Sequence, residues 1–538
     1  MSASSAVIGI NFGTCYTSIG YLTKEGRADC LANEEGDRQI ASVLAFHGEE
    51  QVVGSQAKSD IARHPDTTVA NFRAELGKTF AQGENLPGSS APIIEKDGQP
   101  GYQVTLPSGN VIYTAQEISS FFLRHIRESA EAFLGTAVSG AVMAVPSYFT
   151  DAQREALVKA AEDAGINVLQ LIHESAAAAL AYDAVKDTKD KLVVVCDFGG
   201  HSLDVTALSV RSGLYMILAT AHDTKLGGSS FDDLLINHFS AEFKKKSKVD
   251  ISQNRKALAK LRGAVELTKK MLSSANSAPC FVESLAEGLD FHGTINRMRF
   301  EILSNKVFAK ALDVIRDVLS KADLDASEID EVVLVGGSAR IPKFAVKLRE
   351  VFTAEHTTVR SELEADEVIA RGCALQASLL DGYDKETIKS SQEAIITLAP
   401  HTTKAIGVVN ANNEFIPIVP RGAALPVRRT FEFTNAQAGQ THAYLALHEG
   451  DHVIEKKEIP QEPIEGEEDE EPLEPEIVTE VHTKPSNLLV EACLPLEHGK
   501  EANGSKIEVQ LTIDAERKLS LVMREKNGTN IVKVAGKQ

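Results

Sequence analysis

The apolar residues of the chain follow two different periods. As far as about residue 385, short apolar runs alternate with helical patterns, which is typical of an α/β domain with a largely buried sheet. Two helices are predicted most clearly, within 147–165 and within 254–272. The first has capping-box spacing at Thr150 and Gln153 and ends at Gly165. Its apolar side is formed by Leu157, Val158 and Ala161, and that of the second by Leu258, Leu261, Val265 and Leu272.

After about residue 390 the apolar period becomes two. The segment 505–514 reads "SKIEVQLTID", and its alternating apolar positions are Ile507, Val509, Leu511 and Ile513. Such alternation predicts a half-buried strand, and 518–524 is expected to return antiparallel to it after the turn region 514–517. Further strands are expected within 414–433 and 442–451, and no convincing helix follows Ala394. The C-terminal part is therefore predicted to be a small β domain.

Composition and charge exclude several classes of protein. The 538 residues are 43% hydrophobic and 25% charged, as expected for a globular protein of two to four domains. A net charge of −20 argues against a general polyanion binder, so direct nucleic-acid binding is not expected. No signal peptide or membrane-spanning run is visible, and the six cysteines form no C-x-x-C pair. We expect buried free thiols and a cytoplasmic location.

Three apolar runs end in glycine turns of the kind that cradle phosphates. They read "VIGINFGTCYT" (7–17), "VVVCDFGGHSLD" (193–204) and "EVVLVGGSAR" (331–340). Glycine lets backbone N–H groups approach an anion, and hydroxyl groups nearby add donors; these belong to Thr14, Thr17, Ser202 and Ser338. A single glycine turn usually just connects two elements, but the matching first and second copies indicate a duplicated half-domain with phosphates held between the halves.

Other nucleotide motifs are incomplete, and one polar stripe is open to two interpretations. "LGKT" at 76–79 ends like a P-loop, but the required first glycine is Phe72, and no G-x-G-x-x-G follows a strand. One side of the second helix carries Glu266, Lys269, Lys270 and Ser273. That stripe is either a base-binding face or a solvated face with i,i+4 ion pairs.

Seven blocks of the chain resemble the Hsp70 chaperones in the family's order and approximate spacing. They are "GINFGTCYTS" (9–18), "AVPSYFTDAQREA" (144–156), "LIHESAAAALAY" (171–182), "CDFGGHSLDV" (196–205), "KLGGSSFD" (225–232), "SLAEGLDF" (284–291) and "VLVGGSARIPK" (333–343). Actin and the sugar kinases share the ATPase fold of that family but lack a β domain of the "RGAALPV" type (421–427). The resemblance covers nearly the whole chain.

The resemblance implies a fold, a ligand and a binding site. The fold is α/β: an actin-like duplicated ATPase domain (1–388), a linker (389–402) and a small antiparallel β-sandwich domain without a helical lid (403–538). An acidic segment at 461–476, with nine acidic residues and three prolines, is expected to be a disordered loop. The ligand is ATP, with Mg²⁺ held through water near Asp197. The implied nucleotide-binding residues are Asn11, Gly13, Thr14, Cys15, Tyr16, Arg73, Asp197, Gly199, Gly200, His201, Ser202, Gly228, Glu266, Lys269, Lys270, Ser273, Gly336, Gly337, Ser338, Arg340 and Asp366.

The departures from the family pattern concern cleavage rather than binding. The family's aspartate in the first loop is Asn11, its catalytic lysine is Arg73, and a glycine of the second loop is His201. An amide supplies no negative charge to a hydrated Mg²⁺ and accepts no proton, while a planar guanidinium is not a conservative substitute for an ammonium. The family's "EPT" is "ESA" at 174–176, and the linker has lost its flanking aspartates. We therefore expect an ATP-binding pseudo-ATPase and assign no catalytic residue.

This set of departures is similar to that of the Hsp70-like subunits of fungal ribosome-associated complexes. That similarity implies a stable heterodimer with a J-domain protein of the zuotin type, which brings it to the ribosome. There it would support a cycling cytosolic Hsp70 in folding nascent chains. Two alternatives stay open: a divergent but active Hsp70 ATPase that refolds clients alone, and a small-molecule kinase on the same fold.

Overall fold

The computed structural model describes residues 6–83, 91–183, 190–211, 214–384, 386–388, 400–410, 412–459, 476–497 and 504–536. Two large sheets of identical topology form its centre. In spatial order the first is β12 (Val168–His173), β11 (Val138–Val145), β1 (Ala6–Phe12), β2 (Tyr16–Leu22) and β3 (Ala28–Cys30), with β4 (Ile40–Ala41) paired to β2. The second is β19 (Thr358–Arg360), β18 (Glu331–Val335), β13 (Lys191–Phe198), β14 (Leu203–Arg211) and β15 (Leu214–Asp223).

The two sheets confirm the duplication that the glycine turns predicted. In each sheet the central strand, β1 or β13, pairs in parallel with one neighbour and antiparallel with the strand that directly follows it. Both central strands are buried apolar runs, as expected for strands covered on both faces. The arrangement is consistent with the actin-like duplicated domain expected from the sequence.

Two helices, α5 (Glu174–Asp183) and α10 (Val368–Leu380), lie between the sheets. They share one apolar cluster with β11, β13, β14 and β18. Their approach is so close that a Cβ on Gly372 would lie 1.8 Å from the carbonyl oxygen of Ala177. Only glycine fits there, because any side chain would collide with the backbone of the other helix. This contact fixes the two halves of the domain against each other.

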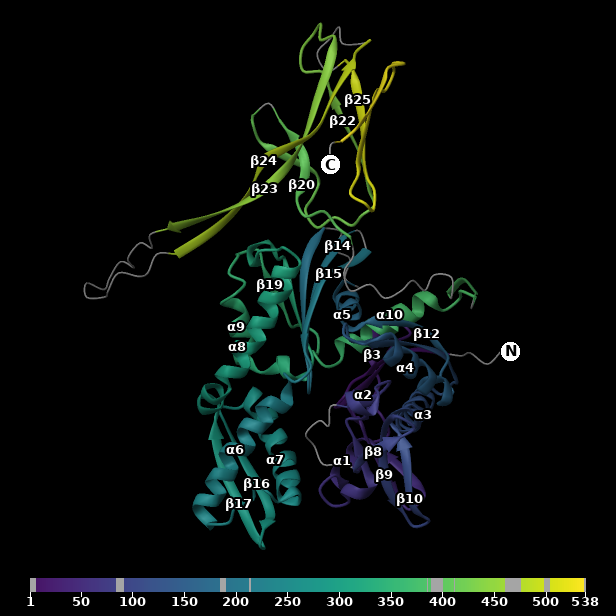
Figure 1. The fold of residues 1–538 in the computed structure, drawn as a ribbon, viewed down its shortest axis with the longest axis vertical. Coiled ribbons are helices and arrows are strands. Elements are labelled where there is room, and N and C mark those ends of the chain that lie inside the picture. The colour runs from purple at the N-terminus through teal and green to yellow at the C-terminus, as the bar shows by residue number, and fades with distance from the viewer. Residues whose placement is uncertain are drawn as a thin grey trace, which may run out of the picture.

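The remaining elements form two lobes, one beyond each sheet (Figure 1). We call β1–β12 with α1–α4 the first lobe, and β13–β19 with α6–α9 the second lobe. Outer elements of the first lobe are α1 (Gly54–Asp60), α2 (Phe72–Glu75), α3 (Ala115–Leu134), α4 (Asp151–Asp163), β5 (Val43–His47), β6 (Glu50–Val53), β7 (Thr68–Ala70), β8 (Ile93–Lys96), β9 (Gln99–Leu106) and β10 (Gly109–Thr114). Those of the second lobe are α6 (Gly228–Ser247), α7 (Arg255–Ser274), α8 (Arg297–Lys321), α9 (Pro342–Arg349), β16 (Ser277–Ala286) and β17 (Leu289–Asn296). Short 3₁₀ turns occur at η1 (Pro65–Thr67), η2 (Phe80–Gln82), η3 (Ala326–Glu328) and η4 (Gly337–Arg340).

Both helices predicted from the apolar stripes are confirmed. Helix α4 begins after an N-cap Thr150 that forms a complete capping box with Gln153. Its buried face contains Leu157, Ala160 and Ala161, with Val158 at the edge of the stripe. Helix α7 buries Leu261, Val265 and Leu272, and Leu258 packs against the same cluster. No helix of the described part of the chain is long and apolar enough to cross a membrane.

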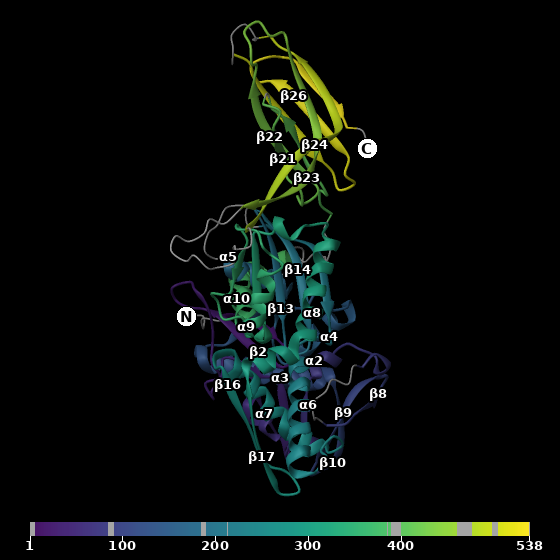
Figure 2. The same cartoon turned by 90° about the vertical axis from the view of Figure 1, so that its left-hand side faces the viewer.

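The C-terminal part consists of two antiparallel sheets packed face to face (Figure 2). One is β21 (Phe415–Val419), β20 (Ala405–Val409), β23 (His442–Ile459) and β24 (Glu476–Pro495). The other is β22 (Val427–Thr434), β25 (Lys506–Ile513), β26 (Leu519–Glu525) and β27 (Ile531–Ala535). The apolar positions predicted for β25 are all buried, and β26 returns antiparallel to it as expected.

The expectations for the C-terminal part differ in their outcome. The strand expected within 442–451 extends to Ile459, because it pairs with β24 along its whole length. No helix occurs after Ala394 in the described residues. The acidic segment 461–476 and most of the expected linker, 389–399, lie outside the described residues, apart from Glu476 at the start of β24.

The C-terminal sheets lie next to β14 and β15 (Figure 1), and an ionic contact joins them to the second lobe. Arg421 donates from Nη1 to both carboxylate oxygens of Glu328 in η3, at 3.1 and 2.9 Å, and pairs with Asp323 at 3.1 Å. His452 of β23 lies 3.0 Å from the same carboxylate. Arg211 of β14 donates to the carbonyl oxygen of Arg421 at 3.0 Å. The two parts of the chain are thus held together by buried charge as well as by chain connection.

Candidate nucleotide-binding site

The site begins with two hairpin loops at equivalent places in the two sheets. Asn11 faces Ser18 near the end of the β1–β2 ladder, and Asp197 faces Asp204 near the end of the β13–β14 ladder. The duplication therefore places an amide in one half where the other half has a carboxylate. Asn11, which replaces the family's aspartate in the sequence, is therefore the counterpart of Asp197 in the structure.

The three glycine turns come together, as predicted. A Cβ on Gly200 would lie 2.4 Å from Sγ of Cys15, so the first and second loops touch. Ser338, in the turn after β18, donates to the carbonyl oxygen of Gly199 at 2.8 Å. Gly228, at the start of α6, lies against Ser338 and Lys269, and its N–H donates to Gly199 at 3.0 Å. Residues far apart in the sequence thus form one loop cluster between the lobes.

A cavity of about 210 Å³ lies at this cluster and is lined from both lobes. Thr14, Arg73 and Tyr148 come from the first lobe, and His201, Ser202 and His222 come from the second. Nε of Arg73 is buried and has no hydrogen-bond partner in the described part of the chain. A buried donor without a partner is costly, and a phosphate oxygen would satisfy it. The hydroxyl groups of Thr14 and Ser202 add donors, so the residues present fit the phosphates of a nucleotide.

Arg73 is held by a buried ion pair. Its Nη2 donates to Oε1 of Glu174 at 2.6 Å, and both side chains are buried. The guanidinium also lies over the ring of Phe149, 5.1 Å from its centroid. One edge and one face of the guanidinium are therefore occupied by protein, which fixes the direction in which its remaining donors point.

Two carboxyl groups of the second half, those of Asp197 and Asp204, are shifted towards their neutral forms. Burial, together with Glu174 and Asp204, raises the pKa of Asp197 well above its usual range. Burial raises the pKa of Asp204 to about 7, although its oxygens accept hydrogen bonds from the Ser147 N–H and hydroxyl groups. No group of three or more His, Cys, Asp or Glu side chains suited to a metal occurs in the described ranges.

Cys15 and His201 are neutral residues of the loop cluster. Enclosure by the loops, together with Glu266, raises the pKa of the Cys15 thiol to about 11. Burial, assisted by Arg262, lowers the pKa of His201 to about 4. At neutral pH neither side chain places a charge beside the phosphate position. Of the six cysteines, Cys15 is half-buried, Cys493 is exposed and the other four are buried free thiols, as mostly expected.

The polar stripe of α7 is used for contacts between the lobes. Tyr16 donates from its hydroxyl group to Glu266 at 2.6 Å, and Lys58 of α1 donates to the same carboxylate at 2.7 Å. Lys270 donates to the Tyr16 oxygen at 2.8 Å. Burial alone would raise the pKa of Glu266, but Lys58 and Lys270 lower it below its ordinary range. Glu266, Lys270 and Tyr16 thus form, with Lys58, a bridge between the two lobes.

Lys269 and Ser273, the other two residues of the stripe, are not part of that bridge. Lys269 pairs with Asp232 at 2.8 Å and donates to the carbonyl oxygen of Gly228 at 3.0 Å, so it supports the loop cluster. Ser273 is half-buried further along α7. Lys58 was not foreseen, because a single lysine in a short helix carries no sequence signal; only the fold brings it to Glu266.

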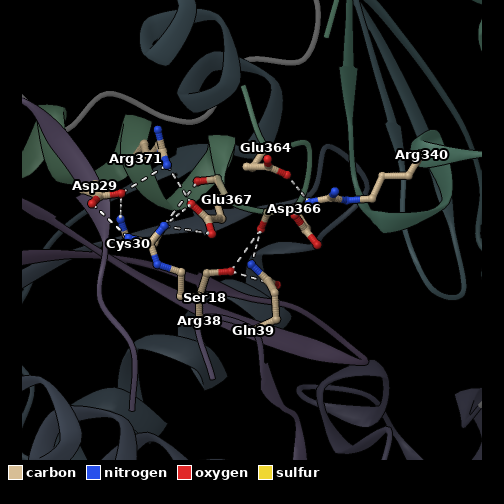
Figure 3. Close-up of polar contacts among 10 residues, drawn as sticks. All are labelled: Ser18, Asp29, Cys30, Arg38, Gln39, Arg340, Glu364, Asp366, Glu367 and Arg371. Carbon is tan, nitrogen blue, oxygen red and sulfur yellow. Dashed lines mark hydrogen bonds and ion pairs between the residues drawn. The ribbon is translucent and has the colours of Figure 1, made fainter. Parts of the chain in front are cut away.

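The third turn carries a guanidinium held by two carboxylates (Figure 3). Arg340 donates from Nη2 to Glu364 and to Asp366, each at 2.5 Å. The carbonyl oxygen of Asp366 in turn accepts from Ser18 at 3.1 Å and from Gln39 at 2.9 Å. Arg340 and Asp366 were expected at the site, whereas Glu364, Ser18 and Gln39 were not. Of these three residues, only Glu364 has a local sequence signal, because its carboxylate lies two positions before Asp366.

An ionic cluster next to Asp366 ties α10 to the strands of the first lobe (Figure 3). Arg371 pairs with Glu367 at 2.7 Å and with Asp29 at 3.1 Å, and Arg38 pairs with Asp29 at 2.9 Å. The cluster fixes the segment that presents Asp366 to Arg340. Its role at the site is therefore one of positioning.

Comparison with known proteins places this geometry in a family. The family model described as Hsp70 protein matches residues 7–461. The chain is 39% identical to a heat shock protein 70 homolog of Schizosaccharomyces pombe, over 98% of this chain and 95% of the relative. It is 36% identical to the ribosome-associated complex subunit SSZ1 of Saccharomyces cerevisiae, over 98% and 99%. It is also 36% identical to a heat shock 70 kDa protein of Emericella nidulans, over 84% of this chain and 69% of the relative. With the duplicated sheets, the three converging glycine turns and these matches taken together, the chain belongs to the Hsp70 family.

Proposed function

We propose that this chain is an ATP-binding co-chaperone subunit of the Hsp70 type that does not hydrolyse its nucleotide at a useful rate. The observation that carries the proposal is Asn11, an amide at the position where the second half of the domain has Asp197. Arg73, paired with Glu174, and His201 change two further contributors to phosphoryl transfer. Such transfer depends on positioning and on neutralisation of charge, so three changes in one site are not readily compensated.

The binding part of the proposal assigns a role to each region of the site. Members of the Hsp70 family bind ATP or ADP, generally with Mg²⁺. The loop cluster around Gly13, Gly199 and Gly336 would hold the phosphates, and the buried Nε of Arg73 supports an anion there. The adenosine would lie towards Glu266, Arg340 and Asp366 together with the other residues expected from the resemblance. Mg²⁺, when bound with ATP, neutralises phosphate charge, and Asp197 would reach it through water.

The domain limits are part of the same proposal. We assign 1–388 to the nucleotide-binding domain, 389–402 to the linker and 403–538 to a β-type substrate-binding domain. The two C-terminal sheets and their buried cluster support the last assignment. The β domain would hold the partner by strand addition, in which an extended segment joins a sheet edge.

The biological setting is proposed from relatedness to a ribosome-associated complex subunit over nearly the full length of both chains. This chain would form a stable heterodimer with a J-domain protein of the zuotin type in the cytoplasm. That partner would bring it to the ribosome, where the pair would support a cycling Hsp70 acting on nascent chains. Co-purification from cell extract followed by ribosome sedimentation tests this directly. A chain that purifies alone and sediments away from ribosomes would contradict the setting but not the family.

Hydrolysis is tested by a single-turnover measurement with purified protein and radiolabelled ATP. We expect binding with a turnover close to the background rate. A rate equal to that of an ordinary Hsp70, lost on D197N, would instead support the second candidate, an active chaperone that refolds clients alone. That candidate also requires client-peptide affinity to differ between ATP and ADP, whereas we expect almost no difference.

A further inference from the structure

His201 joins three segments of the chain around the phosphate end of the cavity. Its Nε2 lies 3.1 Å from Oδ1 of Asn71, and its Nδ1 lies 3.0 Å from Oγ of Ser229. An amide oxygen only accepts, so Nε2 carries the proton and Nδ1 accepts from the Ser229 hydroxyl group. Both ring nitrogens are therefore satisfied by protein, and the side chain has one fixed tautomer.

The two partners of His201 belong to different lobes. Ser229 is at the start of α6 in the second lobe. The loop that carries His201 belongs to the same lobe. Asn71 is in the first lobe, directly before α2. The hydrogen bond between His201 and Asn71 therefore crosses between the lobes, as does the separate bridge of Lys58, Tyr16, Glu266 and Lys270.

Asn71 lies two positions before Arg73, whose guanidinium lines the cavity. Its backbone is left-handed, with φ of 60°, a conformation that asparagine tolerates better than most residues. It precedes α2, and Arg73 follows two residues later with its buried Nε at the cavity. A bond that fixes the Asn71 side chain therefore also fixes the start of α2 and the lobe that carries Arg73.

We propose that the His201–Asn71 hydrogen bond is a strap that closes the phosphate end of the cavity and slows nucleotide release. This inference rests on the proposed binding of nucleotide to this site. A nucleotide held between two lobes leaves when the lobes part, and that movement breaks the strap. A typical protein hydrogen bond corresponds to about a 3- to 10-fold change in an equilibrium or a rate. His201 is a positioning residue here, because it acts through Asn71 and Ser229.

The test measures release of a fluorescent ATP analogue from the full chain, chased with unlabelled ATP in a stopped-flow instrument. We expect H201A and N71G to speed release about 3- to 10-fold each. Glycine accepts the left-handed backbone of Asn71, so N71G removes the bond without adding strain. The double variant H201A/N71G should release no faster than either single variant, because both remove the same bond. H201Q, whose amide N–H reaches the same acceptor, should restore slow release.

Controls separate the strap from general destabilisation and from the proposed function. N413G changes a second left-handed asparagine, φ 65°, in the C-terminal part and should leave release unchanged. Additive effects of H201A and N71G, or release unaltered in both while ATP still binds, would overturn the strap alone. Failure of the wild-type chain to bind the analogue in an equilibrium titration would overturn the proposed function as well. If H201A does not fold, N71G with N413G as its control decides the matter.

Discussion

The chemistry of the site depends on a few side chains whose surroundings differ between the two halves of the domain. Asn11 and Asp197 occupy equivalent places in β1 and β13, yet only Asp197 has a carboxyl group, and burial keeps that group towards its neutral form. Arg73 pairs with Glu174, so its charge is already balanced by protein. The site thus contains donors for phosphate but few free charges.

Restoring the family residues at three positions should restore hydrolysis. We expect the triple variant N11D/R73K/H201G, with Mg²⁺ present, to raise the single-turnover rate on the order of 10²-fold, the usual effect of one properly placed electrostatic group. Each single variant should stay near the wild-type rate, because the other two changes remain. Adding D197N to the triple variant should abolish the gain. A single variant that recovers the full rate would show that the three changes do not act together.

A buried histidine should make stability depend on pH. His173, at the end of β12, is buried, and neither ring nitrogen has a hydrogen-bond partner in the described part of the chain. Burial and Arg154 lower its pKa to about 4, while an unfolded histidine has a pKa of about 6.5. Between these values the unfolded chain binds a proton that the folded chain does not, so stability is lost as pH falls below 6.5. The loss at pH 5 is about 2 kcal/mol relative to pH 8.

The variant H173N removes this titration. Urea denaturation gives the free energy of unfolding of H173N and of the wild type at each pH. We expect the value for the variant minus the value for the wild type to rise by about 2 kcal/mol between pH 8 and pH 5. Taking the difference cancels Asp204, whose raised pKa acts in the opposite direction. H356N, at an exposed position, is the control. A difference that is constant with pH would contradict the assignment.

At the scale of single elements, local sequence signals determined much of the fold. Thr150 and Gln153 predicted the start of α4 because a capping box needs only residues three apart. The alternation in β25 predicted its buried face because successive strand residues point to opposite sides. The length of β23 could not be predicted, since it depends on pairing with β24. Local sequence patterns predict local geometry, whereas the length of a strand also depends on the strand with which it pairs.

The N-cap of α4 provides a test at this scale. T150A removes the side chain that accepts from Gln153 N–H and should cost about 1 kcal/mol of stability. T150S keeps the hydroxyl group and should lie close to the wild type. Both are measured by urea denaturation at neutral pH. Equal losses in T150A and T150S would mean that the methyl group, not the cap, matters.

At the scale of the whole molecule, the contacts that build the site join residues distant in sequence. Lys58 and Glu266 are 208 positions apart, and Asn71 and His201 are 130 apart. Such pairs leave no periodic signal, so neither could be predicted from this sequence. The glycine turns were predicted because each repeats a recognisable local plan, and the topology then explained why they meet. The contacts that hold the lobes and the C-terminal sheets to one another could not be predicted from the sequence.

The contact between Glu328 and Arg421 should control the position of the C-terminal sheets. The Glu328 side chain is 5% exposed and that of Arg421 is 16% exposed, so the pair is largely shielded from water. Removing one partner leaves Arg421 with Asp323 as its ionic partner, or Glu328 with His452, so a largely buried charge loses its main partner, which is unfavourable. In E328A and in R421A we therefore expect the sheets to separate from the second lobe, because separation lets the remaining charge reach water. Small-angle X-ray scattering should show a larger radius of gyration in both variants.

The double variant E328A/R421A distinguishes this explanation from simple loss of contact area. It removes both largely buried charges and leaves only Asp323, which is 73% exposed, without Arg421, so its radius of gyration should lie closer to the wild-type value than that of either single variant. E350A removes a carboxylate that pairs with Lys347 on the surface of α9 and should leave the scattering unchanged. Unchanged profiles in both single variants would assign the contact to other groups, such as Gly422 packed against Leu192 and Leu218. If the profiles change as expected, the ion pair fixes the orientation in which the C-terminal sheets meet the second lobe, and so links these sheets to the lobe that carries His201.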